Sequence, residues 1–304
     1  MSNQRNRILL LGNKGQLGWE LNRCLATLGK LTALDYPHID FLDLAALQRI
    51  IREHKPQVIV NAAAYTAVDK AEEQPELAFG INSTAPGVIA ETSKETNALL
   101  VHYSTDYVFD GSSGRLYIET DKPNPISIYG KSKLQGEQVI EQIGGNYLIF
   151  RTSWMYSLRR SNYLKKVLTW ARNNPVVKVV DDQIGNPTSA RMLAEVTGQI
   201  LTLAGKQVVD WGKEHSGIYH CAGDGYASRF EFAQEILRND PNPEMHVYKK
   251  IIPASSDEFP MPADRPLFAA LDCTKFKNTF GVCLPAWQEG IKFVMQEMPY
   301  SQTI

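Results

Sequence analysis

The most constraining feature of the sequence is a short apolar run that leads directly into three evenly spaced glycines. Residues Arg7-Ile-Leu-Leu-Leu11 have the continuous apolar pattern of a parallel strand that is buried on both faces. The run enters Gly12-Asn-Lys-Gly-Gln-Leu-Gly18, and leucines at helical spacing then continue to Leu28. Strand, glycine turn and helix, in this order, predict a parallel sheet that binds a dinucleotide.

The glycines have a physical role in this prediction. Without Cβ atoms, Gly12, Gly15 and Gly18 permit a tight turn and let a pyrophosphate approach the backbone amides, while the helix N-terminus adds a partial positive charge. Their spacing is G-x-x-G-x-x-G, which differs from the tighter G-x-G-x-x-G fingerprint. A glycine-rich loop with no ligand is the alternative interpretation.

Apolar runs and helical patterns go on alternating through the first half of the chain. Further strands are expected at residues 31–35, 57–61, 99–104 and 147–151, and a long helix at 76–95, kinked or divided by Pro86. We therefore predict an α/β fold, a Rossmann-type doubly wound parallel sheet built mainly by residues 1–154. Residues 155–304 alternate less regularly. They are expected to form a smaller α/β substrate-binding lobe, with possible crossings between the two parts.

Polar side chains follow several of the predicted strands. Asp35 ends the second strand, at a distance from the glycines where an acid commonly bonds the adenosine ribose. Asn61-Ala-Ala-Ala-Tyr-Thr66 follows the third strand, and its small alanines allow a cofactor to lie close. Ser104-Thr105-Asp106 ends the fourth, where a hydroxyl can polarise a substrate carbonyl. An exposed acid and close helix–sheet packing are the structural alternatives.

Tyr129-Gly-Lys-Ser-Lys133 places a phenol and an ammonium four residues apart. In a helix the two side chains lie on one face, one turn apart. The positive charge favours the phenolate, which makes Tyr129 usable as a proton donor near neutral pH. Because the chain has 13 tyrosines, such a spacing also arises by chance, as a helix start with a surface lysine.

Composition and charge narrow the function further. Hydrophobic residues make up 43%, charged residues 21% and the formal net charge is -1, which is ordinary for a soluble protein and favours neither nucleic acid nor membrane as a partner. Four scattered cysteines without C-x-x-C spacing predict no zinc site and no disulfide framework, but reduced thiols in a cytoplasmic protein. The first apolar run is too short for a signal peptide or a membrane span.

Taken together, these motifs resemble the extended short-chain dehydrogenase/reductase family. The resemblance covers nearly the whole chain and includes the glycine turn, Asn61-Ala-Ala-Ala64, Ser104-Thr-Asp106 and the Tyr129–Lys133 pair. Longer strings resemble the nucleotide-sugar reductases of this family. They are Thr66-Ala-Val-Asp-Lys-Ala71, His102-Tyr-Ser-Thr-Asp-Tyr-Val-Phe109, Arg151-Thr-Ser-Trp154, Asp182-Gln-x-Gly-x-Pro-Thr188, Arg265-Pro266 and Leu284-Pro-x-Trp287.

The resemblance implies that NADH or NADPH reduces the C4 ketone of a small nucleotide-linked sugar. By analogy, Tyr129 donates the proton, Thr105 bonds the same oxygen, and Lys133 holds the nicotinamide ribose and lowers the pKa of Tyr129. Asp106 and Trp154 match substrate contacts. The positions matching cofactor contacts are Gly12, Gly15, Gln16, Leu17, Gly18, Asp35, Asp40, Phe41, Ala64, Tyr65, Thr66, Tyr129 and Lys133.

Three alternatives remain open on the sequence. A nucleotide-sugar dehydratase or epimerase is one, although Tyr107 stands where dehydratases of the family carry a second acid. A non-catalytic subunit similar to the regulatory subunit of methionine adenosyltransferase is another. The third concerns the cofactor, because Asp35 favours NADH whereas Lys14 could meet the 2′-phosphate of NADPH.

Some relatives hold Mg²⁺ at a dimer interface through glutamates on three segments. The matching positions here are Glu20, Arg191 and Gln288, so only one carboxylate is kept. A guanidinium has no lone pair to offer a cation that favours carboxylate and water oxygens. We therefore predict no metal, and a monomer or a homodimer that no metal bridges.

Overall fold

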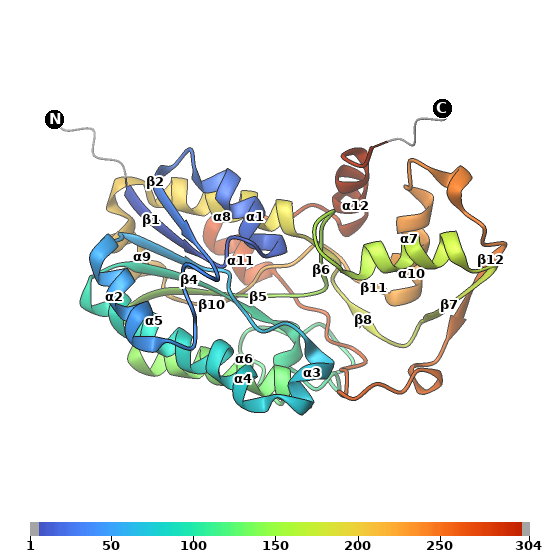
Figure 1. Ribbon diagram of the computed structural model, residues 1–304, viewed down its shortest axis with the longest axis horizontal. Helices are drawn as coiled ribbons and strands as arrows, with labels where there is room; N and C mark the ends of the chain where they lie inside the picture. Colours follow the sequence, from blue (N-terminus) through green and yellow to red (C-terminus); the bar gives the residue numbers. More distant parts are fainter. Residues whose placement is uncertain (1–5, 300–304) are drawn as a thin grey trace.

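The computed structural model describes residues 6–299 and is organised around a six-stranded parallel sheet (Figure 1). The strand order is β10-β5-β4-β3-β1-β2. The strands are β1 Asn6–Leu11, β2 Gly29–Leu34, β3 Val58–Asn61, β4 Leu99–Thr105, β5 Asn146–Thr152 and β10 Gly217–His220. The first five alternate with helices along the chain, which confirms the predicted doubly wound sheet.

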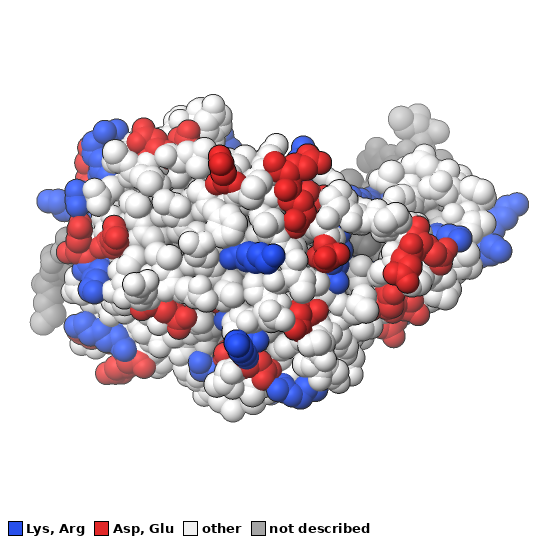
Figure 2. Space-filling view, turned by 90° about the horizontal axis from the view of Figure 1, so that it is seen from below, with Lys and Arg blue, Asp and Glu red and all other residues white. Residues whose placement is uncertain are grey.

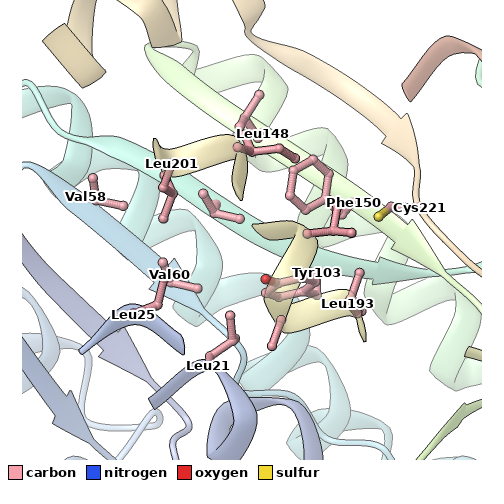
Figure 3. Close-up of a cluster of buried hydrophobic side chains, with 14 of the residues drawn as sticks. Leu21, Leu25, Val58, Val60, Tyr103, Leu148, Phe150, Leu193, Leu201 and Cys221 are labelled. Atoms are coloured by element: carbon pink, nitrogen blue, oxygen red, sulfur yellow. The ribbon is translucent and has the colours of Figure 1, made fainter. Parts of the chain in front are cut away.

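Alternate residues of each central strand pack into different cores. Leu9 and Leu11 of β1 face one cluster, which α2 Leu44–His54, α5 Ala85–Glu95 and α6 Ile128–Ile143 cover. Ile8 and Leu10 face the other, under α1 Gln16–Leu25 and α8 Ala190–Ala204. Figure 3 shows this second cluster between the sheet and these helices. Burial on both faces explains why the strands read as unbroken apolar runs.

The chain returns to the sheet after it has entered the lobe. Edge strand β10 pairs with β5, and α8, α9 Val208–His215 and α11 Thr274–Phe280 pack on the same sheet face as α1. Helices α9 and α11 were not predicted. We propose a division into two parts near residue 154, in which β10, α8, α9 and α11 are the segments that cross back to the sheet.

The remaining elements form a second layer around their own core, at the right of Figure 1. Strand β7 Val176–Val180 pairs in parallel with β12 Lys250–Ala254, and the short strands are β6 Met155–Tyr156, β8 Ile184–Gly185, β9 Thr188–Ser189 and β11 Ala227–Ser228. Three helices supply most of the apolar side chains. They are α7 Tyr163–Asn173, α10 Arg229–Arg238 and α12 Trp287–Gln296.

The long helix expected at residues 76–95 is divided. Helix α4 Pro75–Phe79 passes into a π-helical turn over Gly80–Thr84 before α5 begins. Pro86 lies in the first turn of α5 and has no N–H to continue the ladder, which accounts for the break at this point. The short helix α3 Val68–Glu73 precedes this region, and the helices of this side cover the lower edge of the molecule (Figure 1).

The surface agrees with a net charge near zero. In the view of Figure 2, acidic and basic side chains are interspersed over the face that is shown. Within residues 6–299, no helix combines the length and the apolar character that crossing a membrane requires.

Candidate active site

The glycine turn is shaped by close backbone contacts. Gly12 has φ +84°, and a Cβ there would lie 2.5 Å from the Ala63 backbone nitrogen. Helix α1 starts at Gln16 with Gly15 as its N-cap, and no side chain caps it. Its first amides are therefore open at the carboxyl end of β1, where a pyrophosphate would meet them, so the turn fits a dinucleotide.

Asp35 lies against this turn. Its carboxylate accepts hydrogen bonds from the Lys14 backbone N–H (2.8 Å) and the Tyr36 N–H (2.7 Å). The Lys14 ammonium donates to the Tyr36 carbonyl (2.6 Å). The acid that suits free ribose hydroxyls and the cation that suits a 2′-phosphate are thus neighbours. Gln16 Oε1 accepts from Ser157 Oγ (2.9 Å), which ties the turn to the lobe.

Two of the predicted cofactor residues are core residues. The side chains of Leu17 and Phe41 are buried in the two clusters that flank the sheet, so only their backbones can face a ligand. The Asp40 carboxylate accepts a hydrogen bond from the Leu42 backbone N–H at 2.9 Å, within its own loop. After β3, Ala64 is half-buried and Thr66 is exposed.

Asn82 is a residue that the sequence reasoning missed. It lies in the π-helical turn, fully buried, and its side-chain amide accepts from the Tyr65 N–H (2.8 Å) and donates to the Tyr65 carbonyl (3.0 Å). The widened turn therefore fixes the backbone of the loop that follows β3. The only signal in the sequence was Pro86, which marked the break but not the side chain.

The end of β4 presents a buried acid to the site. Thr105 Oγ1 donates to Asp106 Oδ1 (3.0 Å), and Ser153 Oγ donates to Asp106 Oδ2 (2.7 Å). Burial raises the pKa of Asp106 to about 6, although these two hydrogen bonds and the charge of Arg229 oppose the rise. A carboxyl that ionises in this range can change its charge within the working pH of a cell.

Tyr129 lies at the start of α6, beside Thr105. Ser127 caps the helix by accepting from the Gly130 N–H (3.2 Å), and the Tyr129 ring meets the Tyr107 ring edge-on, with centroids 5.6 Å apart. Burial raises the pKa of Tyr129, a hydrogen bond with Thr105 lowers it, and Asp106 and Tyr107 raise it further. The expected lowering of this pKa by Lys133 is therefore not seen, because desolvation dominates.

Lys133 is buried one turn further along α6. Its ammonium donates to the Tyr103 carbonyl of β4 (2.6 Å) and lies 3.4 Å from His102 Nε2. Burial lowers the pKa of Lys133 to about 8, while the negative charge of Glu137 opposes the change. Tyr129 and Lys133 thus share the helix face that the spacing predicted, with Lys133 fully buried and Tyr129 half-buried.

Trp154 stands across from this group, where the chain leaves β5. Its backbone has a φ of +41°, and its indole packs against the core of the lobe, where it stacks on Phe232 with ring centroids 6.3 Å apart. A Cβ on Gly185 would lie 2.6 Å from that indole. The Arg229 guanidinium lies over the Trp154 ring, with its central carbon 3.5 Å from the ring centroid. Arg229 forms no salt bridge within residues 6–299, whereas Arg265 is held by Asp69 at 2.9 Å. Nothing in the sequence singled out Arg229.

The three positions compared with a metal site lie as follows. Arg191 binds Glu195 at 2.9 Å and also pairs with Glu297. Gln288 is exposed at the start of α12, and Glu20 is half-buried on α1. No group of three or more His, Cys, Asp or Glu side chains in the described part of the chain is arranged to hold a metal ion.

A cavity of about 280 Å³ lies elsewhere. It is lined by Asn186, Cys221, Asp224 and Cys273, among others, and it includes none of the residues predicted for the site. The candidate site is therefore located by convergence of residues at the carboxyl edge of the sheet, where parallel sheets bind ligands.

Relatives of the chain are known. Over 295 residues it is 40% identical to a dTDP-4-dehydrorhamnose reductase of Burkholderia thailandensis, covering 96% of this chain and 99% of that one. It is 37% identical to the protein of the same name from Escherichia coli K12, covering 96% and 97%. A crystal structure of the Bacillus anthracis dTDP-4-dehydrorhamnose reductase in complex with NADP has a TM-score of 0.87 at 31% identity, covering 97% of this chain and 100% of that one.

A Thermus thermophilus UDP-glucose 4-epimerase complex with NAD has a TM-score of 0.77 at 19% identity, which shows a shared fold and no more. The family model described as RmlD substrate binding domain matches residues 6–299. With the doubly wound sheet, the glycine turn and the Tyr129–Lys133 face already in place, the chain belongs to this family of dTDP-4-dehydrorhamnose reductases.

Proposed function

We propose that this protein reduces the C4 ketone of dTDP-4-dehydro-L-rhamnose to give dTDP-L-rhamnose, a step in the synthesis of nucleotide sugars for cell-surface polysaccharides. The observation that carries the proposal is the convergence of Thr105, Asp106, Tyr129 and Lys133 at one sheet edge in a chain that matches named reductases along its whole length. An epimerase shares the fold alone, at 19% identity.

The cofactor in this proposal is NADPH or NADH. When bound, it supplies the hydride that reduces the ketone carbon. The open amides of Gln16 and Leu17 and the close turn at Gly12 support the pyrophosphate end, and Asp35 and Lys14 lie where the adenosine ribose would be read. The related structure from Bacillus anthracis contains NADP, which supports NADPH as the first cofactor to test.

The protein's own part is to hold the ketone and supply one proton. In the proposed reaction the Tyr129 hydroxyl gives its proton to the ketone oxygen. The Thr105 hydroxyl has one proton, which it donates to Asp106 Oδ1 at 3.0 Å in the structure, and it would turn from Asp106 to the ketone oxygen when the substrate binds. Because desolvation raises the pKa of Tyr129, the phenol keeps its proton until the substrate oxygen becomes basic.

Arg229 is the part of the site that fits the nucleotide diphosphate. Its guanidinium carbon lies 3.5 Å from the Trp154 ring centroid and 4.9 Å from the Tyr163 ring centroid, so two aromatic rings hold it in place without a carboxylate partner. A planar guanidinium with unused donors suits a diphosphate. The contact with the Arg229 cation gives Trp154 a role in this proposal in addition to core packing.

The test is an assay of NADPH oxidation with dTDP-4-dehydrorhamnose, in which NMR identifies the product. Formation of dTDP-L-rhamnose supports the proposal. Protein that purifies with stoichiometric NAD⁺ and converts dTDP-sugars without net oxidation of added NADPH would indicate an epimerase or dehydratase. Stable binding to a methionine adenosyltransferase catalytic subunit, without turnover, would indicate a regulatory subunit.

A further inference from the structure

A buried chain of polar groups runs from β3 through β4 to Lys133. His102 is fully buried, and its ring nitrogens face two partners: Nδ1 lies 3.1 Å from Asn61 Nδ2, and Nε2 lies 3.4 Å from Lys133 Nζ. The site described above gives neither Asn61 nor His102 a role. The neighbouring elements β3, β4 and α6 nevertheless place Asn61, His102 and Lys133 in contact with one another in this order.

Hydrogen-bond directions decide which nitrogen of His102 bears a proton. The Ala63 backbone N–H can only donate, and it donates to Asn61 Oδ1 at 3.2 Å. Asn61 Nδ2 must then face His102, and its N–H requires an acceptor at Nδ1. A neutral imidazole with Nδ1 as acceptor carries its proton on Nε2. Burial and the charge of Lys133 hold the pKa of His102 well below its usual range, so the ring is neutral.

The Nε2–H of His102 therefore points at Lys133 Nζ. A charged ammonium has three donors and no lone pair, so it opposes this N–H, whereas a neutral amine can accept from it. The Tyr103 carbonyl, 2.6 Å from Nζ, accepts from the lysine in either form. The contact with His102 is therefore the one that favours the neutral amine of Lys133 over its charged ammonium.

No carboxylate in the described part of the chain pairs with Lys133 to stabilise its charged form. Lys133 forms no salt bridge within residues 6–299, and Glu137, the acid whose charge acts on it, is bound by Arg151 at 2.6 Å. The acids on other elements around α6 are engaged elsewhere. Asp106 raises the pKa of Tyr129, and Glu72 accepts a hydrogen bond from the Ile128 N–H at 2.8 Å. The π-helical turn contributes only the neutral side chain of Asn82.

We propose that Asn61 and His102 are positioning residues that lower the proton affinity of Lys133, the lysine one helical turn from Tyr129. When the ammonium gives its proton to water, the lone pair left on Nζ accepts the His102 Nε2–H. A proton from water restores the ammonium. The proposal rests on the proposed reductase function for its purpose, but the effect on Lys133 can be measured without it.

The direct test is an NMR titration of protein labelled at the lysine ε-carbons, with no substrate or cofactor present. Lys133→Met assigns the signal. His102→Gln offers a carbonyl oxygen to the ammonium, and Asn61→Leu frees Nδ1 to carry the proton. Each should raise the titration midpoint of Lys133 by about half to one pH unit, which is a three- to tenfold rise in proton affinity. A midpoint that stays or falls in both variants overturns the proposal.

A long-range proton–nitrogen NMR spectrum of the histidines supplies the second measurement. It should place the His102 proton on Nε2 in the unmodified protein, and a proton on Nδ1 would overturn the argument even if a variant failed to fold. In turnover, the alkaline limb of the kcat profile should move upward with the NMR midpoint. A uniform loss of kcat at every pH would show a merely structural role.

Tyr103→Phe is the matched control. Tyr103 is next to His102 on β4, but its side chain enters the hydrophobic cluster on the other face of the sheet (Figure 3), where its hydroxyl bonds Thr197 Oγ1 at 2.8 Å. The backbone carbonyl that binds Lys133 is unchanged in this variant. The Lys133 midpoint should therefore remain where it is. Movement in the control as large as in the test variants would sink the proposal, since general loosening of β4 would explain both.

Discussion

Asp106→Asn is expected to stabilise the fold at neutral pH while it weakens catalysis. Burial raises the pKa of Asp106 from 3.8 to about 6 in the folded chain, so ionising this carboxyl costs more in the fold than in the unfolded chain. The difference of about 2 pH units corresponds to about 3 kcal/mol. Asparagine keeps the shape and has no charge to bury. Thr105 can still donate to its Oδ1, and the Ser153 hydroxyl can rotate to accept from its Nδ2.

The sign follows from linkage. A raised folded pKa means that the stabilising state is protonated, fully present below about pH 4 and lost as the pH rises through about 6. The free energy of unfolding of Asp106→Asn, minus that of the unmodified protein, should therefore increase by up to about 3 kcal/mol between about pH 4 and pH 8. Urea unfolding across this range measures the difference, and comparing two proteins cancels the other groups that titrate.

Asp110→Asn is the matched control, because it lies on the loop that follows and shifts the other way. Hydrogen bonds from Asn124, Ser112 and Tyr117 hold the pKa of Asp110 below its usual range. Its stabilisation is present above pH 4 and lost as the pH falls, so this variant should be less stable at neutral pH, with a gap that closes in acid. A pH-independent difference for Asp106→Asn, or one of the same sign as the control, would refute the reasoning.

Three further predictions concern the reaction and the assembly. Tyr129→Phe removes only the transferable proton, so single-turnover NADPH oxidation should slow by about two or more orders of magnitude while cofactor affinity is retained; near-normal rates would remove Tyr129 from the mechanism. Asp35→Ala should weaken NADH more than NADPH, because the carboxylate bonds ribose hydroxyls and repels a 2′-phosphate; equal losses in fluorescence titrations would show that Asp35 does not read this position. Activity should survive EDTA, since Arg191 is engaged by Glu195 and Glu297 and offers no lone pair to a metal; loss of both activity and a dimer in sedimentation, with rescue by Mg²⁺, would contradict this.

The local pattern of the sequence was enough to predict the sheet and its ligand-binding edge. Strands buried on both faces must be continuously apolar, and a parallel order brings their carboxyl ends together. For this reason the sequence alone predicts that Gly12, Asp35, Thr105 and Tyr129 lie near one another. The i, i+4 spacing is enough to put Lys133 on the same helix face as Tyr129.

The chemistry of the site was decided by tertiary structure, because it depends on desolvation and on partners that are distant in the chain. The sequence predicted a lowered pKa for Tyr129, but burial raises it. The partners of Lys133 on β4 are the Tyr103 carbonyl and the His102 ring, 30 and 31 residues away. The cation over Trp154 comes from Arg229, the first residue of a helix in the lobe. Spacing along a chain determines which side chains share a face, whereas the packing of separate elements determines how much water each of them loses and which charge it meets.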